Sequence, residues 1–456
     1  MNPSIRWLYE RVNYERSASI PYKTDLKLDR MRALCARLRD PQRGLPAVHI
    51  AGTKGKGSTA ALVAGAIQRA GYRTGLFTSP HLERLEERVA VDGIPCSEME
   101  LADGLDRLRP HVEQLDREAA GVPGEQGPTF FEILTAFAFD HFRRRDVQLA
   151  VLEVGLGGRL DSTNVCEPVV TAITSISLDH TQQLGATVEE IAAEKGGIIK
   201  HGVPVVCGEL NPGPRAVISH LAGQRSAPLW EVGRTVRYDY RPGRLDADQP
   251  ATIRVECCSP RPEVLVDWVP LALPGRHQAI NAAVTAMICR LLGEAGRPIA
   301  PWALASALAE VHCPARIELV RRRPWVILDG AHNPASVQAL VDYLSEQVRA
   351  SRRFLIFAAA ADKDVPGMLD RLRRSFDETF CARFTNNPRA VEVERLMAWA
   401  ASRFERVSWF DTPQEAYGEA RRRAGPDDLI CATGSFYLAA ELRPVMLDDA
   451  RQSACR

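Results

Sequence analysis

Residues 49–65 read HIAGTKGKGSTAALVAG, a glycine-rich turn between an apolar run and a helical pattern. The usual phosphate-binding loop is G-x-x-x-x-G-K-[ST]. Here Ile50 stands where the first glycine is expected, and Gly57 separates Lys56 from the hydroxyl of Ser58. Strand, glycine-rich turn and helix in this order still favour phosphate binding, because backbone N–H groups can close around an anion at a helix N-terminus. An ordinary strand-to-helix turn is the alternative.

The composition limits the class of protein. A chain of 456 residues predicts two or three domains. Its 58 basic and 57 acidic residues give a net charge of +1, which argues against nucleic acid or an anionic membrane as the main partner. Eleven cysteines without a Cys-x-x-Cys pair are typical of reduced thiols. The first residues show no apolar signal region and no long apolar run follows, so we expect a cytoplasmic protein without a membrane span.

Short apolar runs alternate with helical patterns, which predicts an α/β fold of parallel sheets with crossover helices. We expect a domain over residues 1–312, which contains the loop and a small appended antiparallel sheet at about 230–273. A smaller Rossmann-like α/β domain should follow over residues 313–456. The predicted strand-bearing runs are 46–52, 148–158, 168–180, 325–334, 353–364, 407–412 and 428–442.

Polar residues follow these apolar runs. Glu153 interrupts one run, and His180 ends another. Ligands bind outside the carboxyl ends of parallel strands, so we expect a site at that edge of the sheet. A buried carboxylate needs an ion pair or a metal, and both remain open for Glu153. His180 could equally be a core residue.

A lysine on an apolar helix face is the most informative single residue. The segment 187–200 opens with the capping-box pattern T-x-x-E. Val188, Ile191, Ala192 and Lys195 follow at i, i+3, i+4 and i+7, on one face of the helix. There Lys195 must reach solvent, pair or lose its charge. A neutral amine can add carbon dioxide to become a carbamate, while extension to solvent is the simpler alternative.

These features together resemble the folylpolyglutamate synthase/dihydrofolate synthase family of Mur-ligase-like ATP-dependent amide ligases. The family's motifs occur in its order between about residues 49 and 440: GTKGKGS, TSPHL, TFFE, EVGLGGRLDSTN, LDHTQQLGATVEEIAAEKGGI, GRHQAINAA, DGAHNP and TGSFYL. The family loop reads GTNGKGS, which implies that Lys56 meets phosphate and that the displaced Ser58 faces magnesium. Lys54 departs from the family's asparagine.

The resemblance also implies site residues. Lys56, Glu153, His180 and Lys195 would form the catalytic group. ATP would be bound by Gly52, Thr53, Gly55, Lys56, Gly57, Ser58, Thr59, Asn281, Arg316, Asp329 and His332. Two Mg²⁺ ions would be held by Ser58, Ser79, Glu153, His180 and Lys195, the last as a carbamate. A pterin would meet Thr129, Phe131 and Asp161.

The implied activity is ATP-dependent ligation of L-glutamate to dihydropteroate or to a (tetrahydro)folate, through an acyl phosphate, by a monomer. One alternative is a Mur-type ligase for another carboxylate, although fewer than 50 residues precede the loop, too few for an extra substrate domain. The other is a P-loop ATPase without ligase activity, against which the DGAHNP segment and the buried lysine argue. The sequence leaves open whether both activities operate and how many glutamates are added.

Overall fold

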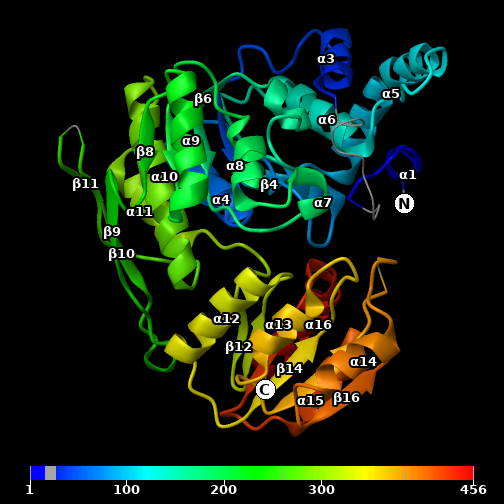
Figure 1. The fold of residues 1–456 in the computed structure, drawn as a ribbon, viewed down its shortest axis with the longest axis vertical. Coiled ribbons are helices and arrows are strands. Elements are labelled where there is room, and N and C mark those ends of the chain that lie inside the picture. The colour runs from blue at the N-terminus through cyan, green and yellow to red at the C-terminus, as the bar shows by residue number, and fades with distance from the viewer. Residues whose placement is uncertain (1, 16–26, 260, 386, 455–456) are drawn as a thin grey trace. The chain divides into compact units, whose positions relative to one another are not determined.

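The computed structural model describes residues 2–15, 27–259, 261–385 and 387–454 (Figure 1). Contacts divide the chain into two compact units. The first comprises Met1–Asp239, Ile253–Pro270 and Ala279–Val311, and the second Tyr240–Thr252, Leu271–Gln278 and His312–Arg456. The last segment starts next to the predicted boundary at 312/313, but two pieces of the region 240–278 group with the second unit. The simple division at 312/313 stays a prediction.

An eight-stranded sheet forms the centre of the first unit. The strands lie in the order β4-β3-β2-β5-β1-β6-β7-β8. All neighbours from β2 to β8 pair in parallel, and β3 pairs antiparallel with β2 and β4. The strands are β1 (Ala47–Ala51), β2 (Thr74–Phe77), β3 (Val89–Val91), β4 (Ile94–Pro95), β5 (Leu149–Glu153), β6 (Pro168–Ile173), β7 (Val205–Cys207) and β8 (Leu229–Glu231).

Helices connect the parallel strands of this sheet, and others precede β1 or follow β8. They are α1 (Pro3–Tyr9), α3 (Leu28–Arg37), α4 (Lys56–Arg69), α5 (Glu98–Ala120), α6 (Phe130–Arg144), α7 (Thr181–Leu184), α8 (Val188–Gly196), α9 (Pro212–Gln224), α10 (Arg276–Glu294) and α11 (Pro301–Glu310), with short 3₁₀ turns η1 (Leu85–Arg88) and η2 (Ser162–Val165). No helix of the described part is long and apolar enough to cross a membrane.

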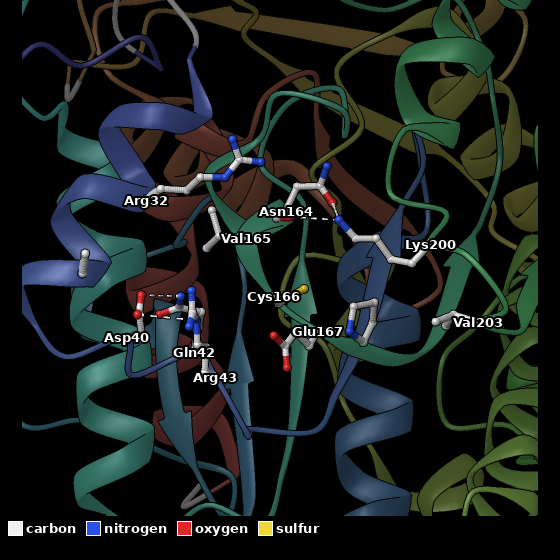
Figure 2. A pocket seen from close by; sticks show the side chains of 12 residues that line it. Arg32, Asp40, Gln42, Arg43, Asn164, Val165, Cys166, Glu167, Lys200 and Val203 are labelled. Atoms are coloured by element: carbon white, nitrogen blue, oxygen red, sulfur yellow. Dashed lines mark hydrogen bonds and ion pairs between the residues drawn. The ribbon is translucent and has the colours of Figure 1, made fainter. Parts of the chain in front are cut away.

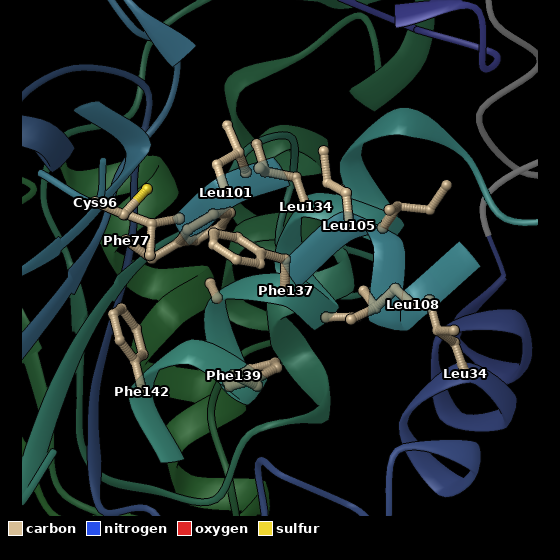
Figure 3. Close-up of a cluster of buried hydrophobic side chains, with 14 of the residues drawn as sticks. Leu34, Phe77, Cys96, Leu101, Leu105, Leu108, Leu134, Phe137, Phe139 and Phe142 are labelled. Carbon is tan, nitrogen blue, oxygen red and sulfur yellow. The ribbon is translucent and has the colours of Figure 1, made fainter. Parts of the chain in front are cut away.

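An aromatic core lies between α5, α6 and the sheet (Figure 3). Phe137, Phe139 and Phe142 of α6 are at most 1% exposed, and Phe77 of β2 is fully buried. Truncating one such ring to alanine costs about 3–5 kcal/mol, because lost burial and a new cavity add together. This packing fixes α6, whose first turn carries the TFFE motif.

The appended sheet occurs where the sequence predicts it. Its strands lie in the order β11-β10-β9 and comprise β9 (Val236–Arg241), β10 (Thr252–Cys257) and β11 (Glu263–Pro270), with η3 (Leu245–Ala247) between the first two. In β10 the burial alternates residue by residue, which is the period of a strand with one covered face.

The second unit contains a six-stranded sheet in the order β12-β13-β17-β14-β15-β16. Among the described strand pairs of this sheet, β12–β13 is antiparallel and the others are parallel. The strands are β12 (Glu318–Arg322), β13 (Trp325–Leu328), β14 (Arg353–Phe357), β15 (Glu378–Ala382), β16 (Val407–Phe410) and β17 (Leu429–Thr433), and the helices α12 (Pro334–Gln347), α13 (Val365–Leu372), α14 (Val393–Ala401), α15 (Pro413–Arg423) and α16 (Phe436–Ala454). The predicted α/β architecture is confirmed, although the sequence patterns missed β12 and β15.

Candidate active site

Three neighbouring strands end at the same level of the first sheet. β1 lies between β5 and β6, with Ile50 opposite Glu153 and Ala51 opposite Ile173. The glycine-rich turn after β1 therefore lies between Glu153 on one side and the segment 174–180 on the other. Parallel sheets place ligands at this edge, in agreement with the expectation from the sequence.

The backbone of the turn passes too close to its neighbours to carry side chains at two positions. Gly52 has φ +152°, and a Cβ there would lie 1.9 Å from Thr174 Oγ1. Gly55 has φ +85°, and its Cβ would lie 2.4 Å from Asn281 Oδ1. The glycines are therefore required, and Asn281 lies against the turn. Ser58 and Thr59 lie buried in the first turn of α4.

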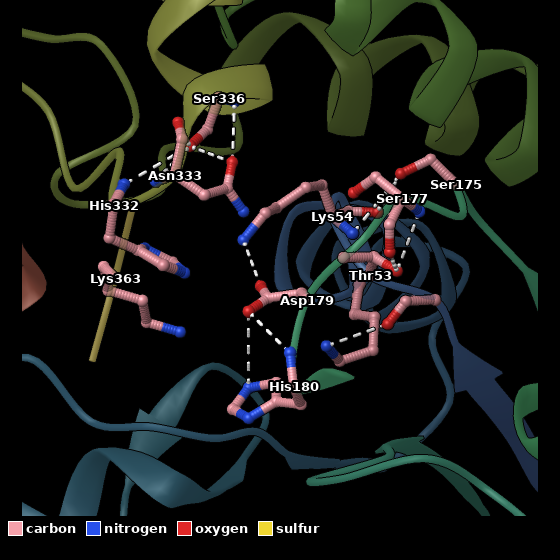
Figure 4. A network of polar contacts seen from close by, with 12 residues as sticks. Thr53, Lys54, Ser175, Ser177, Asp179, His180, His332, Asn333, Ser336 and Lys363 are labelled. Carbon is pink, nitrogen blue, oxygen red and sulfur yellow. Dashed lines mark hydrogen bonds and ion pairs between the residues drawn. The ribbon is translucent and has the colours of Figure 1, made fainter. Parts of the chain in front are cut away.

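The segment after β6 holds the turn in shape (Figure 4). Thr174 Oγ1 donates to Lys54 O at 2.6 Å, and Thr53 N donates to Ser175 O at 2.6 Å. Ser177 N donates to Thr53 Oγ1 at 3.1 Å. These bonds fix the turn through contacts more than 100 residues apart, which no local sequence pattern reveals.

The two lysines of the turn point to different partners. Lys56 Nζ donates to Gly52 O at 3.1 Å, whereas Lys54 Nζ pairs with Asp179 Oδ2 at 3.0 Å (Figure 4). Lys195 Nζ, from α8, also donates to Gly52 O, at 2.8 Å. Burial lowers the pKa of Lys195 well below its usual value, and the nearby charge of Lys56 lowers it further. Of the predicted face of α8, Ile191, Ala192 and Lys195 are buried and Val188 is partly buried. The 4% exposure of Lys195 excludes its extension to solvent.

Oxygen atoms gather beside the turn. Glu153 is buried and its Oε2 accepts from Ser79 N at 3.2 Å. The same oxygen would lie 3.4 Å from a Cβ on Gly57, next to Ser58. Carboxylate and hydroxyl oxygens suit Mg²⁺, so the residues predicted for a first ion fit that ion chemically.

The second predicted ion site is less compact. His180 has φ +50° and a 46% exposed side chain, with Nε2 3.9 Å from Asp179 Oδ1. Within the described ranges no three His, Cys, Asp or Glu side chains form a group that could hold a metal. Of the three residues predicted for the second ion, Glu153 and His180 belong to these residue types, and the third is Lys195. Its convergence on one ion stays a prediction.

The TFFE motif proves to be a helix cap. Thr129 Oγ1 accepts from Glu132 N, and Glu132 Oε2 accepts from Thr129 N, which together form the capping box of α6. The same T-x-x-E pattern as in α8 was available in the sequence. Phe131, in the first turn of α6, lies against the segment that follows β5: its ring would be 2.5 Å from a Cβ on Gly155, and its centroid is 5.8 Å from that of Phe77.

Asp161 is engaged inside the protein. Oδ2 accepts from Gly155 N at 3.0 Å and Leu156 N at 2.9 Å, while Oδ1 accepts from Thr163 N at 3.0 Å and Thr163 Oγ1 at 2.5 Å. A carboxylate has about four acceptor positions, and all are used here. Burial raises the pKa of Asp161, and these bonds oppose the rise. Asp161 shapes the loop next to Phe131, and its direct contact with a pterin stays a prediction.

The remaining predicted residues lie together within the second unit. Asp329 follows β13, is buried and accepts from Ile317 N at 2.9 Å. Burial raises its pKa. The guanidinium of Arg316 lies 4.2 Å from the ring centroid of Phe436, a cation–π contact that the sequence did not reveal. His332 Nδ1 lies 2.9 Å from Gly330 O. Because β13 pairs with β17, the DGAHNP and TGSFYL motifs are neighbours.

A pocket of about 600 Å³ lies elsewhere in the first unit (Figure 2). Arg32, Asn164 and Lys200 line it, and Lys200 Nζ donates to Asn164 Oδ1 at 2.7 Å. Pro168, at the amino end of β6, is also part of its wall. The pocket is therefore at the edge of the sheet opposite the glycine-rich turn.

Comparisons with known proteins decide the family. The model of the Mur ligase middle domain matches residues 111–289, and that of the Mur ligase glutamate ligase domain matches residues 315–436. The dihydrofolate synthase/folylpolyglutamate synthase of Bacillus subtilis strain 168 is 37% identical over 418 residues, 91% of this chain and 94% of the relative. This chain belongs to the dihydrofolate synthase/folylpolyglutamate synthase family. The family predicted from the motifs is thereby confirmed.

Solved members of the dihydrofolate synthase/folylpolyglutamate synthase family share the fold. Escherichia coli FolC in complex with DHPP and ADP has a TM-score of 0.84 and 28% identity, over 99% of both chains. The Mycobacterium tuberculosis folylpolyglutamate synthase complexed with ADP and AMPPCP has a TM-score of 0.82 and 32% identity, over 93% of this chain and 96% of that one. Agreement over nearly the whole chain includes both units described above.

Proposed function

We propose that this member of the family is an ATP-dependent ligase that joins L-glutamate to dihydropteroate, to a folate, or to both. The observation that carries the proposal is the meeting of Lys56, Glu153 and Lys195 around the glycine-rich turn at the carboxyl ends of β1 and β5. The Bacillus subtilis relative is named for both activities, and the solved relatives hold ADP.

The chemistry needs electrostatic support more than a side-chain nucleophile. An oxygen of the substrate carboxylate attacks the γ-phosphorus of ATP, the bond to ADP breaks, and an acyl phosphate forms. The neutral amine of glutamate then attacks the acyl carbon, and inorganic phosphate leaves. Negative charge gathers in both steps, so the ammonium of Lys56 and the N–H groups of the turn stabilise them. Asn281, Arg316, Asp329 and His332 complete the proposed ATP contacts.

Magnesium would supply positive charge at the phosphates. Ser58, Ser79 and Glu153 would hold one ion, as their oxygen atoms suit it. Glu153, His180 and Lys195 would hold a second, with Lys195 as a carbamate. Support for the carbamate is the burial of the amine, which disfavours its charged form.

The pterin would occupy the region of TFFE. Phe131 offers an aromatic face beside Gly155, and Thr129 and Asp161 fix the two segments that flank it. The balanced charge of the chain supports an enzyme without nucleic-acid or anionic-membrane partners. A cytoplasmic location is part of the same proposal. We further propose that it acts as a monomer.

Product formation with separate substrates tests the proposal. Purified protein is incubated with ATP, Mg²⁺ and L-glutamate, and with either dihydropteroate or tetrahydrofolate, and products are identified by mass. A glutamyl adduct with dihydropteroate indicates dihydrofolate synthase activity, and one with tetrahydrofolate indicates folylpolyglutamate synthase activity. Absence of both adducts would favour a Mur-type ligase for another carboxylate or a P-loop ATPase.

A further inference from the structure

A fully buried arginine lies beside the proposed substrate region, outside the residues assigned above. Arg88 ends η1 and is 1% exposed. Nη1 donates to Glu15 Oε1 at 2.7 Å and Nη2 to Glu15 Oε2 at 2.6 Å. Such a two-pronged arginine–carboxylate pair fixes both groups in one orientation. Burying a cation costs desolvation free energy, so a buried arginine needs a more specific role than a contribution to the surface charge.

The same guanidinium also holds the TSPHL motif. Arg88 Nε donates to His81 Nδ1 at 2.9 Å. Because arginine has no acceptor, Nδ1 of His81 must be the acceptor, and the proton of the neutral ring is on Nε2. Arg88 therefore sets the tautomer and the orientation of a ring two residues from Ser79, which binds Glu153 through its backbone.

The third neighbour of Arg88 is the start of α6. The Cζ atom of Arg88 lies 5.5 Å from the ring centroid of Phe130, which stands between Thr129 and Phe131 in the sequence. The N-terminal segment that leads to Glu15 also contacts Phe130. Tyr9 stacks on Phe130 with centroids 5.6 Å apart, and Phe130 N donates to Val12 O at 3.0 Å.

We propose that Arg88 is a positioning residue for the pteroate-type substrate. It ties the N-terminal segment at Glu15 and the TSPHL motif at His81 to the start of α6, so that three segments distant in sequence present one substrate surface. The inference rests on the proposed function, because it takes the region of Thr129 and Phe131 as the pterin site. The turn that would bind ATP is held separately by Thr174, so loss of Arg88 weakens pteroate binding and leaves the binding of ADP without Mg²⁺ almost unchanged.

Equilibrium binding to the full-length chain separates these effects. The Kd values for dihydropteroate and, without Mg²⁺, for ADP are measured by calorimetry, and the Tm by scanning fluorimetry. Arg88→Met removes the charge and the three hydrogen bonds at similar side-chain length. Arg88→Lys keeps the charge without the two-pronged guanidinium geometry. Glu15→Gln weakens the ion pair by removing the negative charge of Glu15, the more exposed of the two side chains. Arg84→Met, four residues earlier and 65% exposed, is the matched control.

We expect Arg88→Met to weaken dihydropteroate binding by about 10-fold or more, since a charge-assisted buried contact is lost. Arg88→Lys and Glu15→Gln should give smaller losses in the same direction. The Kd for ADP should stay within about 2-fold, and Arg84→Met should resemble wild type. Equal losses for both ligands, or an unchanged Kd for dihydropteroate in Arg88→Lys and Glu15→Gln, would overturn the inference. The last two variants decide the matter if Arg88→Met does not fold. A wild-type chain that binds neither dihydropteroate nor tetrahydrofolate would contradict the proposed function instead.

Discussion

Two lysines separated by one residue have different partners in the glycine-rich turn. Lys56 begins α4 and folds back onto Gly52 O, whereas Lys54 precedes the helix and pairs with Asp179. Lys56→Ala should lower kcat/KM at least about 100-fold, because charge stabilisation at the phosphates is lost. Lys54→Asn, which restores the family residue, should change it by no more than about 5-fold, as a partly exposed pair contributes little. Steady-state kinetics of ligation measure both effects. If Lys54→Asn is as damaging as Lys56→Ala, the register of the loop is wrong.

A buried histidine in β1 should make stability depend on pH. His49 is fully buried, and burial, together with the charge of Lys200, lowers its pKa to about 3 from 6.5. Nε2 donates to Thr163 Oγ1, which in turn donates to Asp161. The neutral ring therefore contributes stability that is complete above pH 6.5 and is lost as the pH falls toward 3, because only the unfolded chain takes up the proton.

His49→Gln keeps a donor for Thr163 but cannot titrate. Below pH 6.5 the unfolding free energy of wild type should fall by about 1.4 kcal/mol per pH unit more than that of the variant. Urea unfolding at pH 7.5 and pH 5.5 measures the two slopes. Equal slopes in both proteins would show that His49 takes up a proton in the folded chain as readily as in the unfolded chain.

Some single residues could be foreseen from the sequence and others could not. Lys195 was found because helical spacing alone places it on an apolar face. Arg88 stands in the charged run LERLEERV, which looks exposed, and its burial depends on Glu15 and His81 from other segments. Side-chain contacts between distant segments are set by packing, which local patterns do not encode.

At the scale of elements, the exit of β6 shapes the turn after β1. Thr174 Oγ1, directly after β6, donates to Lys54 O, whereas Thr171 Oγ1, within β6, donates to Pro204 O at 3.2 Å, away from the turn. Thr174→Val should raise the KM for ATP about 10-fold, since a hydrogen bond of about 1 kcal/mol and the shape of the turn are lost together. Thr171→Val removes a hydroxyl equally buried and should leave that KM within about 2-fold. Similar KM values in the two variants would contradict a role of the β6 exit in shaping the site.

Helix and strand prediction succeeded where the signal is local. The capping box at Thr187 and Glu190 was predicted and is present. The capping box at Thr129 and Glu132 has the same T-x-x-E sequence pattern. That motif was nevertheless interpreted only through its resemblance to a substrate-binding sequence. β12 was missed because its residues ELVRR are only half-buried at the sheet edge, so no apolar run marks them.

At the scale of the whole molecule, the proposed site residues come from both units. Lys56, Glu153 and Lys195 belong to the first, and Arg316 and Asp329 to the second. By the proposed chemistry, sustained ATP turnover should require both the pteroate-type carboxylate and L-glutamate, because the acyl phosphate is not consumed without the glutamate amine. An ATPase would not depend on them.

The most direct test is therefore the substrate dependence of ADP formation by the purified chain. With ATP and Mg²⁺ we expect sustained ADP release only when L-glutamate is present together with dihydropteroate or tetrahydrofolate, and one glutamyl product per ADP. Omission of L-glutamate, or of the pteroate-type substrate, should reduce the rate of ADP release to background. Sustained ADP release without glutamate or a pteroate, or without a glutamyl product, would contradict the account.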